Sequence, residues 1–428
     1  MSVESELLVW AARYGETAII RFLLANEADP NVRDNTGNVP LIEASSEGHL
    51  EIVRLLLQSG ADPNLRDSTG DIPQNESSRR GHLETVRLLL HCGADPNVRS
   101  GEGDTALLVA ALNGSSEITR LLLANGADPN VPDESGRTAL IVSSERGHLE
   151  TVRLLLTNGA DPDVRSGKGD DALILAVKNG CVEVIDLLLD NGADSNVQDK
   201  DQSAALMFAA RDGRPDIAHL LLSNGANPNL HNKYKDTALI LGASHHRVEV
   251  IDLLLTNGAD PNLRNNDGNI ALMWAVRGNC VEVIDLLLTN GADPTVQNNN
   301  GDTALIEAAK WNFVEVIDLL LDNNAGPNIQ NNNGATALIL AAESGHLDAV
   351  NLLLNNRADT YLKNKEGRTA LNRAMQKGHN SVVNTLFHAH TEHFNHYSDI
   401  PRTLVGDDAF DRMVEKESGK SGKKKDWS

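Results

Sequence analysis

The sequence predicts an all-α solenoid, in which helix–turn–helix repeats stack in one dimension instead of folding around one globular core. The phrase Gly-Ala-Asp-Pro-Asn, or a close variant, returns every 33 residues with no insertion or deletion between copies. Each period contains two short apolar runs with helical spacing. Most of these runs end at a glycine, which suits the left-handed residue that closes a helix. The alanine of the phrase falls at Ala28, Ala61, Ala94, Ala127, Ala160, Ala193, Ala226, Ala259, Ala292, Ala325 and Ala358.

Repeat 5, residues 133–165, shows the order of elements within one period. A turn-forming stretch at residues 133–137 comes first and contains a glycine suited to positive φ. Thr138 then offers an N-cap hydroxyl to a first helix predicted at residues 139–146, which Gly147 ends. A second helix is predicted at residues 149–157, and its apolar stripe is Val152, Leu154, Leu155 and Leu156.

This turn–helix–loop–helix repeat resembles the ankyrin repeat. The resemblance rests on T-x-L-x-x-A, then G-H-x-E-x-V-x-L-L-L, then G-A-D-x-N, and twelve copies in register cover residues 1–388. It implies an ankyrin-repeat solenoid of paired antiparallel helices with β-hairpin-like fingers. It also implies a curved stack whose concave face binds other proteins.

The chain departs from the family pattern at the start of the first helix and in the loop after it. Where the family has Thr-Pro-Leu-His, this chain mostly has Thr-Ala-Leu-Ile, so we expect apolar packing at Ile141, Ile240 and Ile306 to replace the histidine's hydrogen bonds. The loop glycine is replaced by His246, Asn279 and Asn312, residue types that tolerate positive φ.

Repeat 3 is predicted to be a weak joint. It places Gln74 where its neighbours have a buried leucine, and a buried amide without partners costs roughly 1–3 kcal/mol. One interpretation is that the array opens or bends here, separating repeats 1 and 2 from the rest. The other is that a water or a neighbouring side chain satisfies Gln74.

The domain prediction is one array with two short C-terminal segments. Residues 1–388 form twelve repeats, of which the first and last act as caps, and Asn372 and Arg373 supply polar side chains in the last. Residues 389–412 are predicted to form a helical extension, and residues 413–428 a disordered polar tail.

Composition and charge narrow the classes of partner. The net charge is -22 and the pI about 5.0, which argues against nucleic acid and anionic membranes and fits either solubility of the array or a basic protein partner. No apolar run is long enough to span a membrane, and the N-terminus does not read as a secretory signal. Cys181 and Cys280 occupy equivalent positions three repeats apart, which is too far for a disulfide bond, so we expect reduced thiols and a cytoplasmic location. We also expect the chain to be a monomer.

Aromatic residues are only 3% of the chain, and none occurs between Phe22 and Phe208. Several then fall in repeats 7 to 10, at the exposed positions of the first helices or at a fingertip, next to cationic residues. Exposed Trp, Tyr and Arg dominate interface hot spots, although aromatic side chains can also merely fill gaps between helices. The predicted partner-binding residues are Phe208, Arg211, Tyr234, Trp274, Arg277, Lys310 and Trp311.

The second helices carry a column that changes sign along the chain. Repeats 1 to 5 have Arg21, Arg54, Arg87, Arg120 and Arg153, and the later repeats have Asp186, His219, Asp252, Asp285 and Asp318. In repeats 2 to 5 each arginine follows a glutamate at i+3, which predicts pairing within the helix. Separate duplication of two ancestral repeats explains the change; an acidic face for a basic partner is the alternative.

No motif in the sequence predicts catalysis or a cofactor. It contains no phosphate-binding loop, no H-E-x-x-H and no C-x-x-C. His388, His390, His393 and His396 form the one metal-like cluster, but no cysteine or carboxylate with clear spacing completes it, so neither a metal nor a cofactor is expected.

These observations favour a non-enzymatic protein-interaction scaffold. A bacterial effector, secreted into the cytosol of a host cell, is the first alternative, because bacteria that live inside host cells use ankyrin arrays in this way. An enzyme with a site in the His-rich extension is the second alternative.

Overall fold

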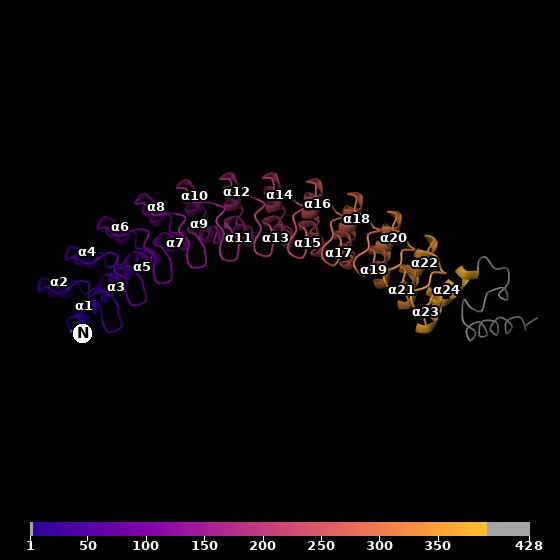
Figure 1. Ribbon diagram of the computed structural model, residues 1–428, viewed down its shortest axis with the longest axis horizontal. Coiled ribbons are helices and arrows are strands. Elements are labelled where there is room, and N and C mark those ends of the chain that lie inside the picture. Colours follow the sequence, from indigo (N-terminus) through magenta and orange to yellow (C-terminus); the bar gives the residue numbers. More distant parts are fainter. Residues whose placement is uncertain (1–2, 392–428) are drawn as a thin grey trace, which may run out of the picture. The chain divides into compact units, whose positions relative to one another are not determined.

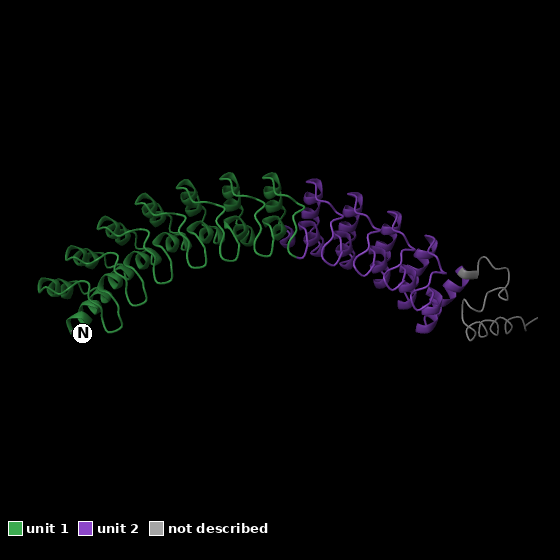
Figure 2. Ribbon diagram, in the orientation of Figure 1, with its two compact units in different colours: residues 1–209, 214–233 green, residues 210–213, 234–428 purple. Residues whose placement is uncertain are grey.

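The computed structural model describes residues 3–391, and its helices fall into two compact units (Figures 1 and 2). Unit 1 is residues 1–209 with 214–233, and unit 2 is residues 210–213 with 234–428. Within the described part of the chain, the regular elements are helices and one isolated antiparallel bridge, between Gln198 and Ala204. The predicted all-α fold is therefore confirmed.

Two helices come from each repeat. Those whose residues all lie in unit 1 are α1 (Val3–Tyr14), α2 (Thr17–Ala25), α3 (Pro40–Ser46), α4 (Leu50–Gln58), α5 (Pro73–Arg79), α6 (Leu83–His91), α7 (Ala106–Leu112), α8 (Ser116–Ala124), α9 (Ala139–Glu145), α10 (Leu149–Thr157), α11 (Ala172–Asn179), α12 (Val182–Asp190) and α14 (Pro215–Ser223). The division between the units passes through α13 (Ala205–Asp212).

Unit 2 continues the same alternation. Its helices are α15 (Ala238–Ser244), α16 (Val248–Thr256), α17 (Ala271–Arg277), α18 (Val281–Thr289), α19 (Ala304–Trp311), α20 (Val314–Asp322), α21 (Ala337–Ser344), α22 (Leu347–Asn355), α23 (Ala370–Lys377) and α24 (Asn380–Thr391). Odd-numbered helices are the first of each repeat and even-numbered helices the second. Within each unit, neighbouring first helices pack side by side, and so do neighbouring second helices (Figure 1).

Repeat 5 forms as its sequence predicts. The Thr138 hydroxyl accepts a hydrogen bond from the amide of Ile141, and Gly147 adopts φ of 73° after the helix. The second helix has the predicted bounds, while the first ends at Glu145, one residue earlier than predicted. The loop substitutes His246, Asn279 and Asn312 have φ of 57°, 52° and 59°, which confirms that they keep the turn.

The core runs continuously through each unit because small residues on the first helices allow close packing. Ala139, Leu140 and Ile141 are at most 2% exposed, and Val152 and Leu155 of the second helix are fully buried. Ile240 and Ile306 are likewise buried, as expected for the apolar residues that replace the family histidine.

The asparagine of the repeated phrase, where it is present, joins a repeat to the next one. In repeat 4, Asn130 Nδ2 donates to the carbonyl of Gly159 at 3.0 Å, and its Oδ1 accepts from the amide of Asp161 at 2.8 Å. Asn31, Asn64, Asn97 and Asn262 repeat this pair of bonds. The spacing of 33 residues is therefore held by hydrogen bonds between polar groups as well as by apolar packing.

The loops between repeats project as fingers from the side of the first helices (Figure 1). Backbone hydrogen bonds join neighbouring fingers. In unit 2, the amides of Asn266, Asn299, Asn332 and Lys365 each donate to a carbonyl of the preceding finger at 2.9 Å. A single backbone bond between each pair of these fingers is too little for a regular ladder, which explains why hairpin-like fingers form without extended strands in the described residues.

The arginine column of the second helices pairs both within and between repeats. Arg54, Arg87 and Arg153 lie 3.8, 3.4 and 3.7 Å from the glutamate at i-3, as predicted. Arg120 instead contacts Glu150 of the next repeat at 3.1 Å, so the prediction of i+3 pairing is wrong for this residue. The cause is the stacking of repeats, which places Glu150 of the next repeat as close to Arg120 as a glutamate on the same helix would be.

Repeats 3 and 12 place polar side chains at positions where most other repeats have apolar ones. Gln74 is 1% exposed, and its Nε2 has no hydrogen-bond partner among the described residues. Arg373 Nη2 lies 2.6 Å from Glu343 of the preceding repeat. Residues 392–412 of the predicted extension, and the tail from 413, lie outside the described residues. Among the helices that are described, none has both the length and the apolar character to span a bilayer.

Candidate functional site

The first helices expose one side next to the fingers, and we call this side the inner face. In unit 1, Glu145 and Leu175 of the first helices line a cleft together with finger residues. In unit 2, Arg277 lines a smaller cleft together with finger residues such as Asn269 and Asn298. Glu145 and Leu175 occupy the repeat positions of Arg277 and Trp274, so these two positions, three residues apart on a first helix, lie on this face in both units.

In unit 2, four of the predicted residues lie on two neighbouring first helices. Trp274 and Arg277 belong to α17, and Lys310 and Trp311 belong to α19, which packs against it. The Arg277 guanidinium lies 5.1 Å from the centroid of the Trp274 ring, and Lys310 Nζ lies 5.6 Å from that of Trp311. Both distances fall within the range of cation–π contacts.

Glu307 links the two helices. Arg277 Nη2 donates to Glu307 Oε1 at 3.0 Å, and the Glu307 side chain is only 12% exposed. The sequence interpretation missed this residue, although its position 30 residues after Arg277 was a usable signal. We call Trp274, Arg277, Glu307, Lys310 and Trp311 the tryptophan cluster.

The two tryptophans of the cluster differ in exposure. Trp311 is 57% exposed, which is unusual for an apolar side chain of this size. Trp274 is half-buried, and its indole Nε1 is enclosed without a hydrogen-bond partner among the described residues. Trp274 therefore also fills space between first helices, whereas Trp311 stands open to a partner.

Two further predicted residues of unit 2 lie away from the cluster. Tyr234 is 56% exposed on a finger, and its carbonyl accepts the amide of Asn266. Arg211 Nε lies 2.9 Å from Asp212, and the Arg211 carbonyl accepts from Arg247 Nε at 3.2 Å. Tyr234 and Arg211 therefore lie on a finger and on α13, and not on the two helices of the tryptophan cluster.

Phe208 belongs to unit 1, where it lies beside a lysine that the sequence interpretation did not select. Lys178 Nζ lies 4.4 Å from the centroid of the Phe208 ring. The same ammonium is 2.6 Å from Asp170 and 3.6 Å from Asp199. Two half-buried carboxylates therefore hold the cation over the aromatic ring.

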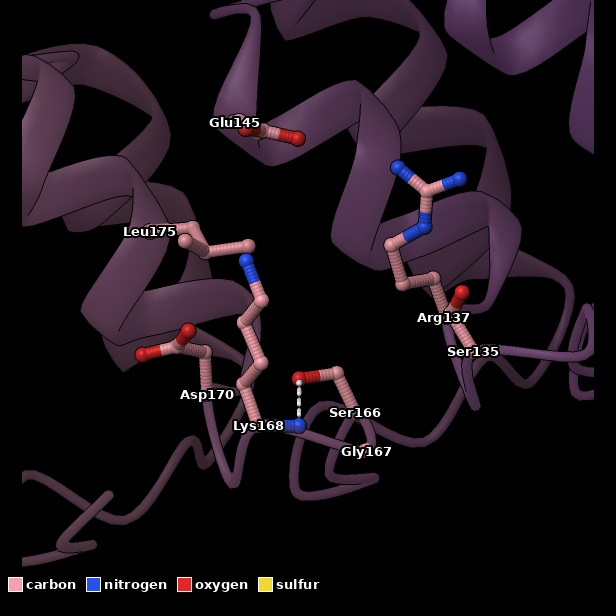
Figure 3. A pocket seen from close by; sticks show the side chains of 8 residues that line it. All are labelled: Ser135, Arg137, Glu145, Ser166, Gly167, Lys168, Asp170 and Leu175. Atoms are coloured by element: carbon pink, nitrogen blue, oxygen red, sulfur yellow. Dashed lines mark hydrogen bonds between the residues drawn. The ribbon is translucent and has the colours of Figure 1, made fainter. Parts of the chain in front are cut away.

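A cleft of about 490 Å³ opens on the inner face of unit 1 (Figure 3). The fingers of repeats 5 and 6 form its lower wall, and α9 and α11 contribute Glu145 and Leu175. The Lys168 side chain extends from its finger toward these helices in Figure 3. The cleft is lined by both positive and negative side chains, so it fits polar side chains of a peptide better than an apolar ligand. The lining residues are Ser135, Arg137, Glu145, Ser166, Gly167, Lys168, Asp170 and Leu175.

Among the side chains that the structure describes, residues 3–389, no group of three or more His, Cys, Asp or Glu is placed to hold a metal ion. His388 is exposed on α24, whereas His393 and His396 lie outside the described residues. All three cysteines are free, and burial raises the pKa of the Cys181 thiol, which opposes a nucleophilic thiolate.

Comparisons with known proteins agree with the repeat architecture. A family model described as ankyrin repeats (3 copies) matches residues 3–67, 75–166, 159–232, 206–298, 239–331, 272–364 and 315–397. Among solved structures, the chain is similar to the ankyrin repeat domain of Bcl-3, described as a unique member of the IkappaB protein family. The identity is 30%, the TM-score is 0.47, and the match covers 51% of this chain and 98% of that one. No match was found among the curated proteins.

Proposed function

This chain belongs to the ankyrin repeat family, and from that premise we propose that it is a non-enzymatic scaffold that binds a partner protein on its inner face. The observation that carries the proposal is the tryptophan cluster of unit 2. An exposed tryptophan, a half-buried one and two cations lie on adjacent helices of a chain that has few aromatic residues.

The cluster has the physical properties of an interface hot spot. Trp and Arg are enriched where truncation to alanine costs at least about 2 kcal/mol of binding free energy. Because Glu307 already holds Arg277, little side-chain entropy is lost when a partner covers it. Lys310 is exposed beside the Trp311 ring, so the pair offers a partner both an apolar plane and a charge.

The partner that fits the charge of the chain is a basic protein. The net charge of -22 favours encounter with a cationic surface and disfavours nucleic acid and anionic lipid. We expect the chain to act as a monomer in the cytoplasm. A secreted effector would use the same face in the cytosol of a host cell, and an export assay on the chain with residues 389–428 deleted tests that role.

Affinity capture tests the scaffold proposal. The wild-type chain and the Trp274→Ala/Trp311→Ala variant are used in parallel as bait in a lysate of the source cells. Proteins retained by the wild type and lost with the variant are the expected partners. Identical sets from the two baits would contradict the assignment of the binding site to the tryptophan cluster.

A further inference from the structure

The first helix of unit 1 exposes an apolar stripe that the core does not use. Val3, Leu7, Trp10 and Tyr14 of α1 are 85%, 38%, 46% and 61% exposed. Their spacing of i, i+4, i+7 and i+11 places them along one side of a helix. The rings of Trp10 and Tyr14 are in contact, with centroids 5.2 Å apart. We call these four residues the α1 stripe.

The stripe is longer than the equivalent side of other first helices. α1 has 12 residues and α3 has 7, because residues 3–6 continue the helix where the later repeats have a finger. A helix of this length presents about 18 Å of surface. Ordinary capping repeats turn a polar face to solvent, so a row of four exposed apolar residues requires another explanation.

Part of the tryptophan cluster recurs around the stripe. Trp10, Arg13 and Glu43 occupy the positions of Trp274, Arg277 and Glu307 in the repeat pattern. Arg13 Nε and Nη2 each donate to the Glu43 carboxylate at 2.7 Å, just as Arg277 donates to Glu307. The same three residue types with the same ion pair thus stand on the inner face of both units.

The charges around the stripe specify the partner. Glu4, Glu6, Glu43 and Glu47 lie on α1, on α3 or at its C-terminal cap, whereas Arg13 is the one lysine or arginine on these two helices. Because Glu43 already neutralises Arg13, the surroundings of the stripe are acidic. An anionic membrane is therefore repelled, and a cationic partner is attracted.

We propose that the α1 stripe is a second docking site, which takes a lysine- or arginine-bearing amphipathic helix of a partner protein. The apolar face of that helix covers Leu7, Trp10 and Tyr14, and its flanking cations face Glu4 and Glu47. Helix-in-groove recognition uses apolar anchors at this spacing, with charged flanks that set the orientation. The site lies within unit 1 and does not depend on the tryptophan cluster of unit 2.

The direct test uses a labelled 16-residue peptide with leucines at i, i+4, i+7 and i+11 and lysines at the flanking positions. Fluorescence anisotropy measures its affinity for the full chain. The Leu7→Ser/Trp10→Ser variant is expected to bind at least about tenfold more weakly, since it removes two central anchors. Phe22→Ser is the matched control, because Phe22 is 67% exposed on α2 of the same repeat, and it is expected to leave the affinity within twofold.

Two further arms separate this proposal from the alternatives. The Trp274→Ala/Trp311→Ala variant is expected to bind the peptide like the wild type, and its failure to do so would assign the peptide to the tryptophan cluster. A peptide with glutamates in place of the lysines is expected not to bind. Absence of binding by the lysine peptide, equal binding by the Leu7/Trp10 variant, or binding of the chain to anionic lipid vesicles would each overturn the proposal.

Discussion

At the residue scale, one of the side chains that cap a first helix is a carboxylate and not a hydroxyl. The first helix begins with a threonine cap in repeats 4, 5, 8, 10, 11 and 12, but α11 begins with Asp171. Asp171 Oδ1 accepts from the amide of Ile174 at 2.7 Å, while Oδ2 is buried without a partner among the described residues. Burial raises the pKa of this carboxyl to about 6.

The raised pKa makes the stability of the array depend on pH. The folded chain binds this proton more tightly than the unfolded chain, so the stabilisation is complete below pH 4 and is lost as the pH rises through about 6. We predict that Asp171→Thr raises the free energy of unfolding by about 1–3 kcal/mol at pH 7.5 and by much less at pH 4. Urea titrations of both proteins at both pH values measure this difference. An equal gain at the two pH values would contradict the assignment.

Hydrogen-bonding histidines were also missed at this scale. His82, His148 and His346, at the end of the loop between the paired helices, contact a carbonyl of the preceding first helix at 3.0, 3.2 and 3.1 Å. Sequence reasoning treated this histidine as part of a motif and gave it no role. A contact that crosses 36 residues follows from stacking geometry, which single-repeat patterns do not contain.

At the element scale, α5 carries the least apolar core of the first helices in unit 1. Gln74, Asn75 and Ser78 are buried, and each has a side-chain atom without a partner among the described residues. Asn75 Nδ2 does donate to the carbonyl of Asp104 at 2.8 Å, so one of the buried polar groups of this helix has a hydrogen-bond partner. Even so, α5 packs against α3 and α7. The weak joint therefore remains a prediction that repeat 3 has a lower free energy of local unfolding, and not that its helices pack differently.

Amide hydrogen exchange measures that energy. We predict faster exchange of backbone amides in residues 73–91 than in residues 139–157. The reason is that each buried polar side chain without a hydrogen-bond partner costs roughly 1–3 kcal/mol of stability. Gln74→Leu restores the residue of the neighbouring repeats and is expected to slow exchange in α5 by about tenfold or more. Equal protection of the two stretches in the wild type would show that repeat 3 is no weaker than repeat 5.

At the scale of the whole molecule, the period predicted the fold, whereas contacts between repeats required the structure. Helix bounds in repeat 5 agreed to within one residue because caps and glycines are local signals. Ion pairs such as Arg277–Glu307 and Arg120–Glu150 join residues 30 positions apart. The residues of each pair are separated by three residues less than the repeat period. An alignment of the repeats would therefore reveal these ion pairs, whereas the apolar pattern of a single helix does not.

The candidate site was only partly predictable for the same reason. The scarcity of aromatic residues selected Trp274 and Trp311, but it did not find Glu307 or Lys178, which hold their neighbours in place. The α1 stripe was missed because it lies in a repeat interpreted as a cap. Its signal, four apolar residues in a row along one side of α1, becomes informative only when their exposure is known.

The central claim is that the tryptophan cluster carries partner binding. Calorimetric titration of a captured partner into the wild type, the Trp274→Ala/Trp311→Ala variant and the Tyr361→Ala variant tests it most directly. Tyr361 is a matched control, since it is a 43% exposed aromatic residue of unit 2 outside the cluster. We expect Kd to rise at least about 30-fold in the double variant and to stay unchanged in Tyr361→Ala. A double variant that binds within about threefold of the wild type would contradict it.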